Sequence, residues 1–191
     1  MTNNTDEKKR QRRTMTIVKT YPLGVLAIAV VLNFFVFGVD PVAVSVPSAD
    51  SIHALIIAAV LLVINHTWLM TTTELTRVRF KMYSTPEEWV ASGTSRQDAP
   101  EEGVRELERR HNTHRNTTEN TIYFVLLVLV FVSVSPTTLA AQAWVVGYAV
   151  ARLGYTYSYL SGNDKARGAF MSLSLLAIYG IASYLLMSLI A

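Results

Sequence analysis

Apolar side chains gather in four long runs that carry few or no charges. These runs occupy residues 20–39, 51–73, 120–152 and 168–191. Helices of that length can cross a hydrocarbon core of about 30 Å, because each residue adds about 1.5 Å. Pro136 interrupts the third run, which predicts two helices within it. The pattern therefore predicts an all-α integral membrane protein with five spans, at about 18–39, 52–75, 120–135, 138–160 and 169–190.

Polar segments divide the chain into a basic tail at 1–17, an extra N-terminal transmembrane helix at 18–39 and a four-helix domain at 52–190. The segment STPEEWVASGTSRQDAPEEG contains proline, glycine and serine breaks and predicts irregular structure. Good helix formers follow it, so we expect a helix that begins near Val104, protrudes from the membrane and continues unbroken to Ser133. The helices of the domain are predicted at about 52–75, 104–135, 138–160 and 168–190.

Basic residues predict the orientation of the spans. Lysines and arginines precede the first span and fall between the second and third and between the fourth and fifth, whereas the opposite loops carry none. The positive-inside rule makes that basic side cytoplasmic, including the N-terminus and the 77–118 loop. Topology and contact with anionic membrane lipid therefore account for the basic excess, and we do not expect nucleic-acid binding.

The first span could instead be a signal peptide that is cleaved, because a basic KKRQRR sequence precedes it. Its run of about 20 apolar residues is longer than the usual core of a signal peptide, and no clear cleavage site follows it. We therefore expect a retained anchor.

Composition limits the chemistry that the chain can perform. Of its 191 residues, 51% are hydrophobic and 16% are charged, whereas soluble domains carry about 25% charged residues. The absence of cysteine excludes disulfides and cysteine nucleophiles. His111 and His114 are three residues apart, but no third ligand of suitable spacing follows, so no metal site is predicted. Any thiol chemistry must come from a bound molecule.

Charged side chains reach the threshold of the third span. Arg115 and Glu119 are four residues apart and Asn116 and Glu119 are three apart, so all three can share one helix face. The uncharged run 120–135 is only about 24 Å long as a helix, which is short for a bilayer. These polar groups are therefore expected at interfacial depth, either as a surface ion pair or as ligands of a bound molecule.

A second polar set lies within the fourth span. Arg152, Tyr155 and Tyr159 follow one helix face, about two turns inside the cytoplasmic end. An arginine at that depth costs about 3 kcal/mol on insertion scales, so we expect it to face a partner or a wet cavity rather than only to extend toward the interface. Arg77 and Arg167 come from the same level of the second and fifth spans.

Arginines suit carboxylates or phosphates, and a glutamate suits an ammonium group. A small peptide with two carboxylates and one amine, such as glutathione, fits these side chains better than a nucleotide does, because the sequence has no glycine-rich phosphate loop. Spacing alone does not single out glutathione.

Three stretches carry a resemblance to a known family: RVRFKMYSTPEEW, ERRHNTHRNTTENTIYF and ARLGYTYSYLSG. In their order and spacing, residues 52–190 resemble the MAPEG family, the membrane-associated proteins of eicosanoid and glutathione metabolism. The nearest branches are those of microsomal prostaglandin E synthase and microsomal glutathione transferase. The resemblance implies a four-helix bundle that assembles as a homotrimer and binds glutathione between neighbouring subunits near the cytoplasmic face.

The resemblance also implies roles for particular residues. It makes Arg167 the catalytic residue that activates the thiol, with a lipophilic electrophile or peroxide as the substrate. The residues expected to bind glutathione, or another low-molecular-weight thiol, are Arg77, Arg115, Asn116, Glu119, Arg152, Tyr155 and Tyr159.

The chain departs from the prostaglandin synthase pattern in several places. Tyr155 stands where that branch has histidine, Gly168 where it has serine and Met171 where a tyrosine would help. The turn before the last helix is one residue shorter, so the match of Arg167 requires a gap. Prostaglandin isomerisation is therefore not a specific expectation. A non-catalytic lipid-binding member of the same fold and a small transporter are the alternatives, although broken helices and internal repeats, which are typical of transporters, are absent from the sequence.

Overall fold

The computed structural model describes residues 2–191, and its side chains are described from Asp6 onward. All regular elements within this range are helical, which confirms the predicted fold class. Their order is α1 (Thr2–Leu32), the π-helix η1 (Asn33–Phe37), α2 (Ala49–Arg79), α3 (Pro86–Ala91), the 3₁₀ turn η2 (Arg96–Asp98), α4 (Glu101–Ser133), α5 (Thr138–Ala141), the π-helix η3 (Gln142–Val146), α6 (Gly147–Leu160) and α7 (Asp164–Ser188).

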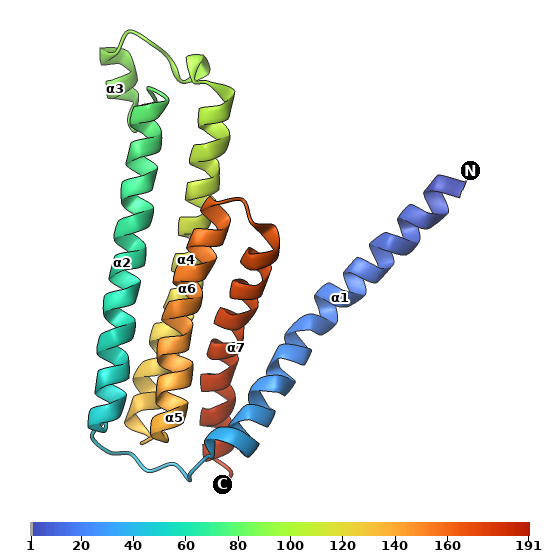
Figure 1. Cartoon of the computed structure of the whole chain (residues 1–191), viewed down its shortest axis with the longest axis vertical. Coiled ribbons are helices and arrows are strands. Elements are labelled where there is room, and N and C mark those ends of the chain that lie inside the picture. Colours follow the sequence, from blue (N-terminus) through green and yellow to red (C-terminus); the bar gives the residue numbers. More distant parts are fainter. Residues whose placement is uncertain (1) are drawn as a thin grey trace.

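Four long helical stretches form an up-and-down bundle: α2, α4, the continuous run α5–η3–α6, and α7 (Figure 1). Helix α1 stands beside this bundle and meets it near the C-terminus, while its N-terminal half leans away. The N-terminal end of α1, the α3 segment and the α6–α7 turn lie toward one end of the molecule. The three basic segments of the sequence therefore gather on one side, although which side of the membrane this is stays a prediction.

Four helices of the described chain are long and apolar enough to cross a membrane: Asp6–Phe37, Ala49–Phe80, Glu101–Ser133 and Asp164–Ser188. The predicted span at 138–160 is helical but is not one of these four. It carries Arg152 and several tyrosines, and much of it is buried between the other helices. Protein rather than lipid surrounds Arg152, Tyr148 and Tyr155, whereas Tyr157 is exposed. Burial among the other helices explains how this stretch can carry an arginine within the bundle.

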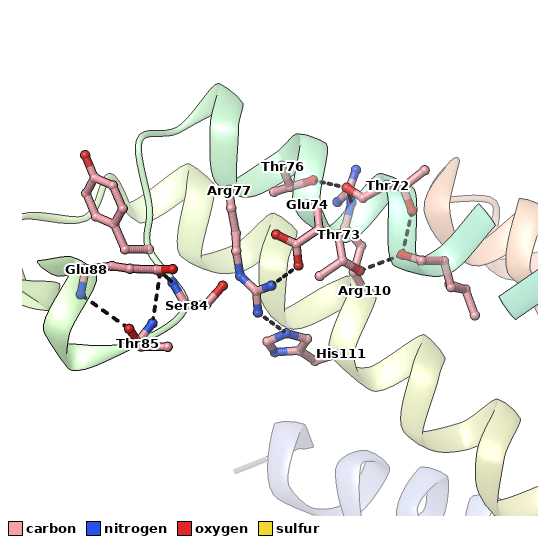
Figure 2. Close-up of polar contacts among 12 residues, drawn as sticks. Thr72, Thr73, Glu74, Thr76, Arg77, Ser84, Thr85, Glu88, Arg110 and His111 are labelled. Atoms are coloured by element: carbon pink, nitrogen blue, oxygen red, sulfur yellow. Dashed lines mark hydrogen bonds and ion pairs between the residues drawn. The ribbon is translucent and has the colours of Figure 1, made fainter. Parts of the chain in front are cut away.

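The helix ends on the basic side differ from the sequence prediction in three respects. Helix α4 begins at Glu101 rather than near Val104, and the predicted tail continues the α1 helix. The segment predicted to be irregular contains α3, whose first turn is closed by a capping box between Thr85 and Glu88 (Figure 2). A second capping box joins Ser95 to Asp98, and its hydrogen bonds hold the pKa of the Asp98 carboxyl below its ordinary value.

One buried amide ties the N-terminal helix to the bundle. Asn33 is fully buried; its Nδ2 donates to the Gly180 carbonyl at 2.8 Å and to Ser183 Oγ at 2.9 Å. Its Oδ1 accepts a hydrogen bond from Trp144 Nε1 at 2.8 Å. Gly180 is required at this point, because a Cβ there would collide with the Trp144 ring. Val25 and Ala29 continue the buried stripe of the helix at four-residue spacing.

Asn33→Leu is expected to lower the free energy of unfolding by about 1–3 kcal/mol, because the substitution leaves Trp144 Nε1 without a partner in a buried site. Thermal unfolding in detergent measures the change. Phe34→Leu is the matched control, since that ring is 65% exposed. Equal stability of the two variants would mean that apolar packing alone holds the N-terminal helix.

Candidate functional site

Arg152 lies at the centre of a polar network inside the bundle. Its side chain has no solvent exposure, and its Nη2 donates to Asn116 Oδ1 at 2.9 Å and to Thr117 Oγ1 at 2.7 Å. Its guanidinium carbon lies 4.3 Å from the centre of the Tyr155 ring, and its Nη1 faces Met171 Sδ at 3.9 Å. The sequence expectation that Arg152 faces a partner is therefore met by neutral side chains from three helices, α4, α6 and α7.

A chain of aromatic contacts connects this network to the end of α7. The rings of Tyr155 and Tyr159 are 5.6 Å apart, and the Arg167 guanidinium lies 4.9 Å from the centre of the Tyr159 ring. Arg167 also forms an ion pair with Asp164 at 3.3 Å. Arg152 and Arg167 thus lie at opposite ends of the pair formed by Tyr155 and Tyr159. Arg152 is enclosed by protein, whereas the Arg167 side chain is 40% exposed.

Arg167 and Tyr159 lie on the wall of an open cavity of about 380 Å³. Helix α4 supplies the other wall through Arg105, Glu108, Arg109 and Asn112. The lining carries three arginines against two carboxylates, Glu108 and Asp164, and this excess of positive charge suits an anionic ligand. The Tyr159 ring keeps one side of the Arg167 guanidinium away from water. We call this cavity the Arg167 cleft.

Arg77 occupies a different cavity, of about 440 Å³, between the end of α2, the α3 segment and α4. Its guanidinium forms an ion pair with Glu74 and donates to His111 Nε2 at 3.4 Å, as Figure 2 shows. Arg110 lies close by and ties α4 to α2 through the Thr72 carbonyl at 3.1 Å. This cavity and the Arg167 cleft share no lining residue.

Arg115 and Glu119 lie on the exposed face of α4, between the flanks that carry these two cavities. They form no ion pair with each other or with any other side chain of the described residues. The surface ion pair that the sequence allowed is therefore absent from the part of the chain that is described. Unpaired charges at interfacial depth are costly against lipid, so both groups are available to a ligand or a neighbouring protein.

The structure brings together part of the predicted set. Asn116, Arg152 and Tyr155 form one network that leads through Tyr159 to Arg167. Sequence reasoning missed Thr117, Asn112 and Asp164. Asp164 stands three residues before Arg167, and Asn112 continues the α4 stripe through Asn116 and Glu119, so helical spacing could have identified both.

A search of curated proteins found no match. A family model, however, matches residues 55–187, more than two thirds of the chain. That model is the MAPEG family. The chain belongs to the MAPEG family.

The MAPEG match covers the bundle and every candidate site residue, from Arg77 to Arg167. Helix α1 lies outside it. With its four long apolar helices, the protein is an integral membrane protein of MAPEG type. The MAPEG family includes glutathione transferases and synthases, and also members without enzymatic activity.

Proposed function

We propose that this protein is a membrane-bound, glutathione-dependent transferase, peroxidase or isomerase that activates a bound thiol as its thiolate. The observation that carries the proposal is Arg167, held against Tyr159 on the wall of an open cavity inside the family-matched segment. Glutathione or another low-molecular-weight thiol is the proposed cosubstrate.

Charges on α4 suit the ends of such a thiol peptide. Glu119 binds the ammonium group and Arg115 a carboxylate, since both are exposed and unpaired within the described chain. Asn116 supplies a hydrogen bond to the peptide. Because Arg152 is enclosed by protein, it acts through Asn116, whose amide oxygen it holds.

Arg167 would stabilise the sulfur anion. A thiol of pKa about 8.5 is only a few per cent ionised at neutral pH, and lowering its pKa by about two units requires about 2.7 kcal/mol. A nearby arginine can supply this once a neighbouring subunit and the ligand exclude water from the cleft. The proton leaves to solvent. On an electrophilic carbon, the sulfur forms an S–C bond while the leaving group, such as chloride, departs with its electron pair. On a hydroperoxide, the sulfur takes up the terminal oxygen as the O–O bond breaks, the alkoxide leaves as the alcohol after taking a proton, and a second thiol converts the sulfenic acid to a disulfide and water.

A lipophilic substrate has a place to approach from the bilayer. A cavity of about 400 Å³ lies along α2 and α4, lined mainly by apolar groups with His66, Thr117, Thr118 and Thr121. The same groove favours the second candidate function, a lipid-binding protein without catalysis. Glutathione-dependent turnover of a lipophilic chloro-aromatic or a lipid hydroperoxide by the purified protein supports the enzyme. Saturable lipid binding without any thiol-dependent turnover or thiol binding would support the alternative.

The active assembly is proposed to be a homotrimer. Arg77 and the Arg167 cleft lie in separate cavities of one chain, so a single ligand meets both only when Arg77 comes from a neighbouring copy. A second copy would also cover Arg115 and Glu119, which otherwise face lipid or solvent unpaired. The family resemblance supports three copies.

Mixed trimers test this arrangement. Arg77→Ala and Arg167→Ala homotrimers are each expected to have little activity at limiting thiol. In a mixed trimer, one interface combines an intact Arg167 with an intact Arg77, so turnover should return to about one third of wild type. Co-expressed, differently tagged copies purified through both tags give the measurement, with native mass spectrometry confirming three copies. Activity equal to the mean of the two parents would place the whole site within one chain.

A cytoplasmic N-terminus completes the proposed topology, because all three basic segments lie on one side. A reporter fused at the N-terminus is expected to report the same compartment as one inserted in the loop at residues 92–95. Opposite compartments for the two reporters would contradict the five-span topology.

A further inference from the structure

Two asparagines are fully buried in the bundle, and they differ sharply in their partners. Asn33 makes three hydrogen bonds. Asn65, in the middle of α2, has no exposure, and neither its Oδ1 nor its Nδ2 has a partner among the described residues. Burying an amide without a partner is strongly unfavourable, and more so at membrane depth, where water is scarce. The burial of Asn65 therefore points to a partner other than the described protein groups.

Four further buried polar atoms of the described residues lack a protein partner in the same way. Two of them, Thr156 Oγ1 and Arg152 Nε, belong to α6, which packs against α2; the others are Arg77 Nε and Tyr184 Oη. Most buried hydroxyls nearby, such as those of Thr73, Thr113 and Ser158, donate to the carbonyl four residues earlier in their helix. The Thr156 hydroxyl makes no such bond, so its hydrogen-bonding capacity is directed elsewhere.

Contacts between the helices bring Asn65, Thr156 and Arg152 to one level of the bundle. Trp68 of α2 and Tyr157 of α6 have ring centres 6.4 Å apart, and the two helices run in the same direction. Asn65 lies one turn before Trp68, on the buried face of α2. Thr156 precedes Tyr157 and lies one turn after Arg152 on the buried face of α6. The register thus aligns Asn65 with the stretch that runs from Arg152 to Thr156.

Contacts of α4 independently place its polar residues at the same depth in the bundle as Asn65 and Arg152. The rings of His66 on α2 and His114 on α4 are 6.0 Å apart. One turn further along α4 lie Asn116 and Thr117, which accept the hydrogen bonds of Arg152. Three helix pairs therefore agree on the level at which the unpartnered atoms meet.

We propose that Asn65, Thr156 and Arg152 Nε bind internal water between α2, α4 and α6. Asn65 needs both a donor and an acceptor, and water supplies both, whereas an anion could only accept. Internal waters in proteins make about three hydrogen bonds to groups that are otherwise unpaired, which matches this set. The water completes the solvation of the Arg152 guanidinium on the side turned away from Asn116.

This water gives Asn65 a positioning role. The guanidinium of Arg152 forms no ion pair with a carboxylate of the described residues. Hydrogen bonds to neutral groups and the Tyr155 ring therefore fix its orientation. A water behind Nε would hold the guanidinium plane in place and, through it, the Asn116 amide that faces the thiol. Only this last step rests on the proposed function; the water site does not.

A double-mutant cycle tests the water site by itself. Asn65→Leu and Thr156→Val keep the size of each side chain but remove its hydrogen bonds. Each is expected to lower the midpoint of thermal unfolding in detergent by about 3 °C or more, and the double variant by no more than the larger single change, because both variants lose the same water. Midpoints that are unchanged or raised in the single variants would show that the groups bind no water and would overturn the proposal. Changes that simply add in the double variant would show that the two groups share no water, and would overturn it as well.

The positioning role has its own measurement. Asn65→Ser keeps a donor and an acceptor with room for water, so it should bind glutathione within about twofold of wild type, whereas Asn65→Leu should bind it several-fold more weakly. Equal affinities of the two variants would overturn the positioning role, whatever the cycle shows. A wild-type protein that binds no thiol would overturn the proposed function, and the stability cycle would still decide the water site.

Discussion

Replacing Arg167 with alanine is expected to abolish formation of the bound thiolate while leaving glutathione binding within several-fold of wild type. Arg167 lies against Tyr159 on the cleft wall, away from the α4 charges that are proposed to hold the ends of the peptide. Its charge matters most at the reacting sulfur. Turnover at saturating thiol should therefore fall far more than affinity, by about 100-fold if two units of thiol pKa are lost.

Lys165→Ala is the matched control for this substitution. It removes one exposed cation from the same first turn of α7, at a position that does not line the cleft. Thiolate absorbance, glutathione affinity and turnover should all stay near wild type. If Arg167→Ala instead retains full thiolate formation and turnover, the alignment gap that gives Arg167 its role is wrong. Arg152 then becomes the remaining candidate for thiol activation and should fail the same assay.

Glu119→Gln is expected to weaken thiol binding by about 2–3 kcal/mol, roughly 30- to 150-fold in Kd, because it removes a charge-assisted hydrogen bond to the ligand ammonium while keeping its shape. The contact is present before and during reaction, so kcat at saturating thiol should change little. Isothermal titration of glutathione and steady-state kinetics give the two quantities.

The unfolding midpoint of the Glu119→Gln variant shows whether Glu119 contacts the ligand or stabilises the fold. The side chain forms no ion pair within the described chain, so its loss should leave the unfolding midpoint of the ligand-free protein unchanged. Glu102→Gln, which is exposed in the first turn of α4, is the control for removing an acid from this helix. Wild-type affinity in Glu119→Gln would assign the ammonium to another group.

Hydrophobic runs and one-sided basic segments predicted the helical architecture well, because lipid leaves few alternatives for an apolar run of about 20 residues. The interior partner of Arg152 was also foreseeable, since a guanidinium two turns inside the membrane must be satisfied by something. The particular partners, Asn116 and Thr117, depend on how α4 and α6 are rotated about their axes relative to each other. The spacing of residues within each helix does not determine that rotation.

Other features lay beyond sequence reasoning for physical reasons. Helix α3 is short and sits in a polar segment, so capping side chains rather than an apolar stripe define it. The separation of Arg77 from the Arg167 cleft depends on which flank of α4 each helix covers. Asn65 resembles any polar residue within an apolar run until its surroundings are known.

Thiolate absorbance in the ultraviolet, followed while glutathione is titrated into the purified wild-type protein at neutral pH, tests the central claim most directly. The account predicts a saturating signal close to one thiolate for each occupied site, which disappears on acidification below about pH 6 as the sulfur is protonated. Binding of glutathione without any thiolate signal above that of the free thiol would contradict thiol activation by this protein.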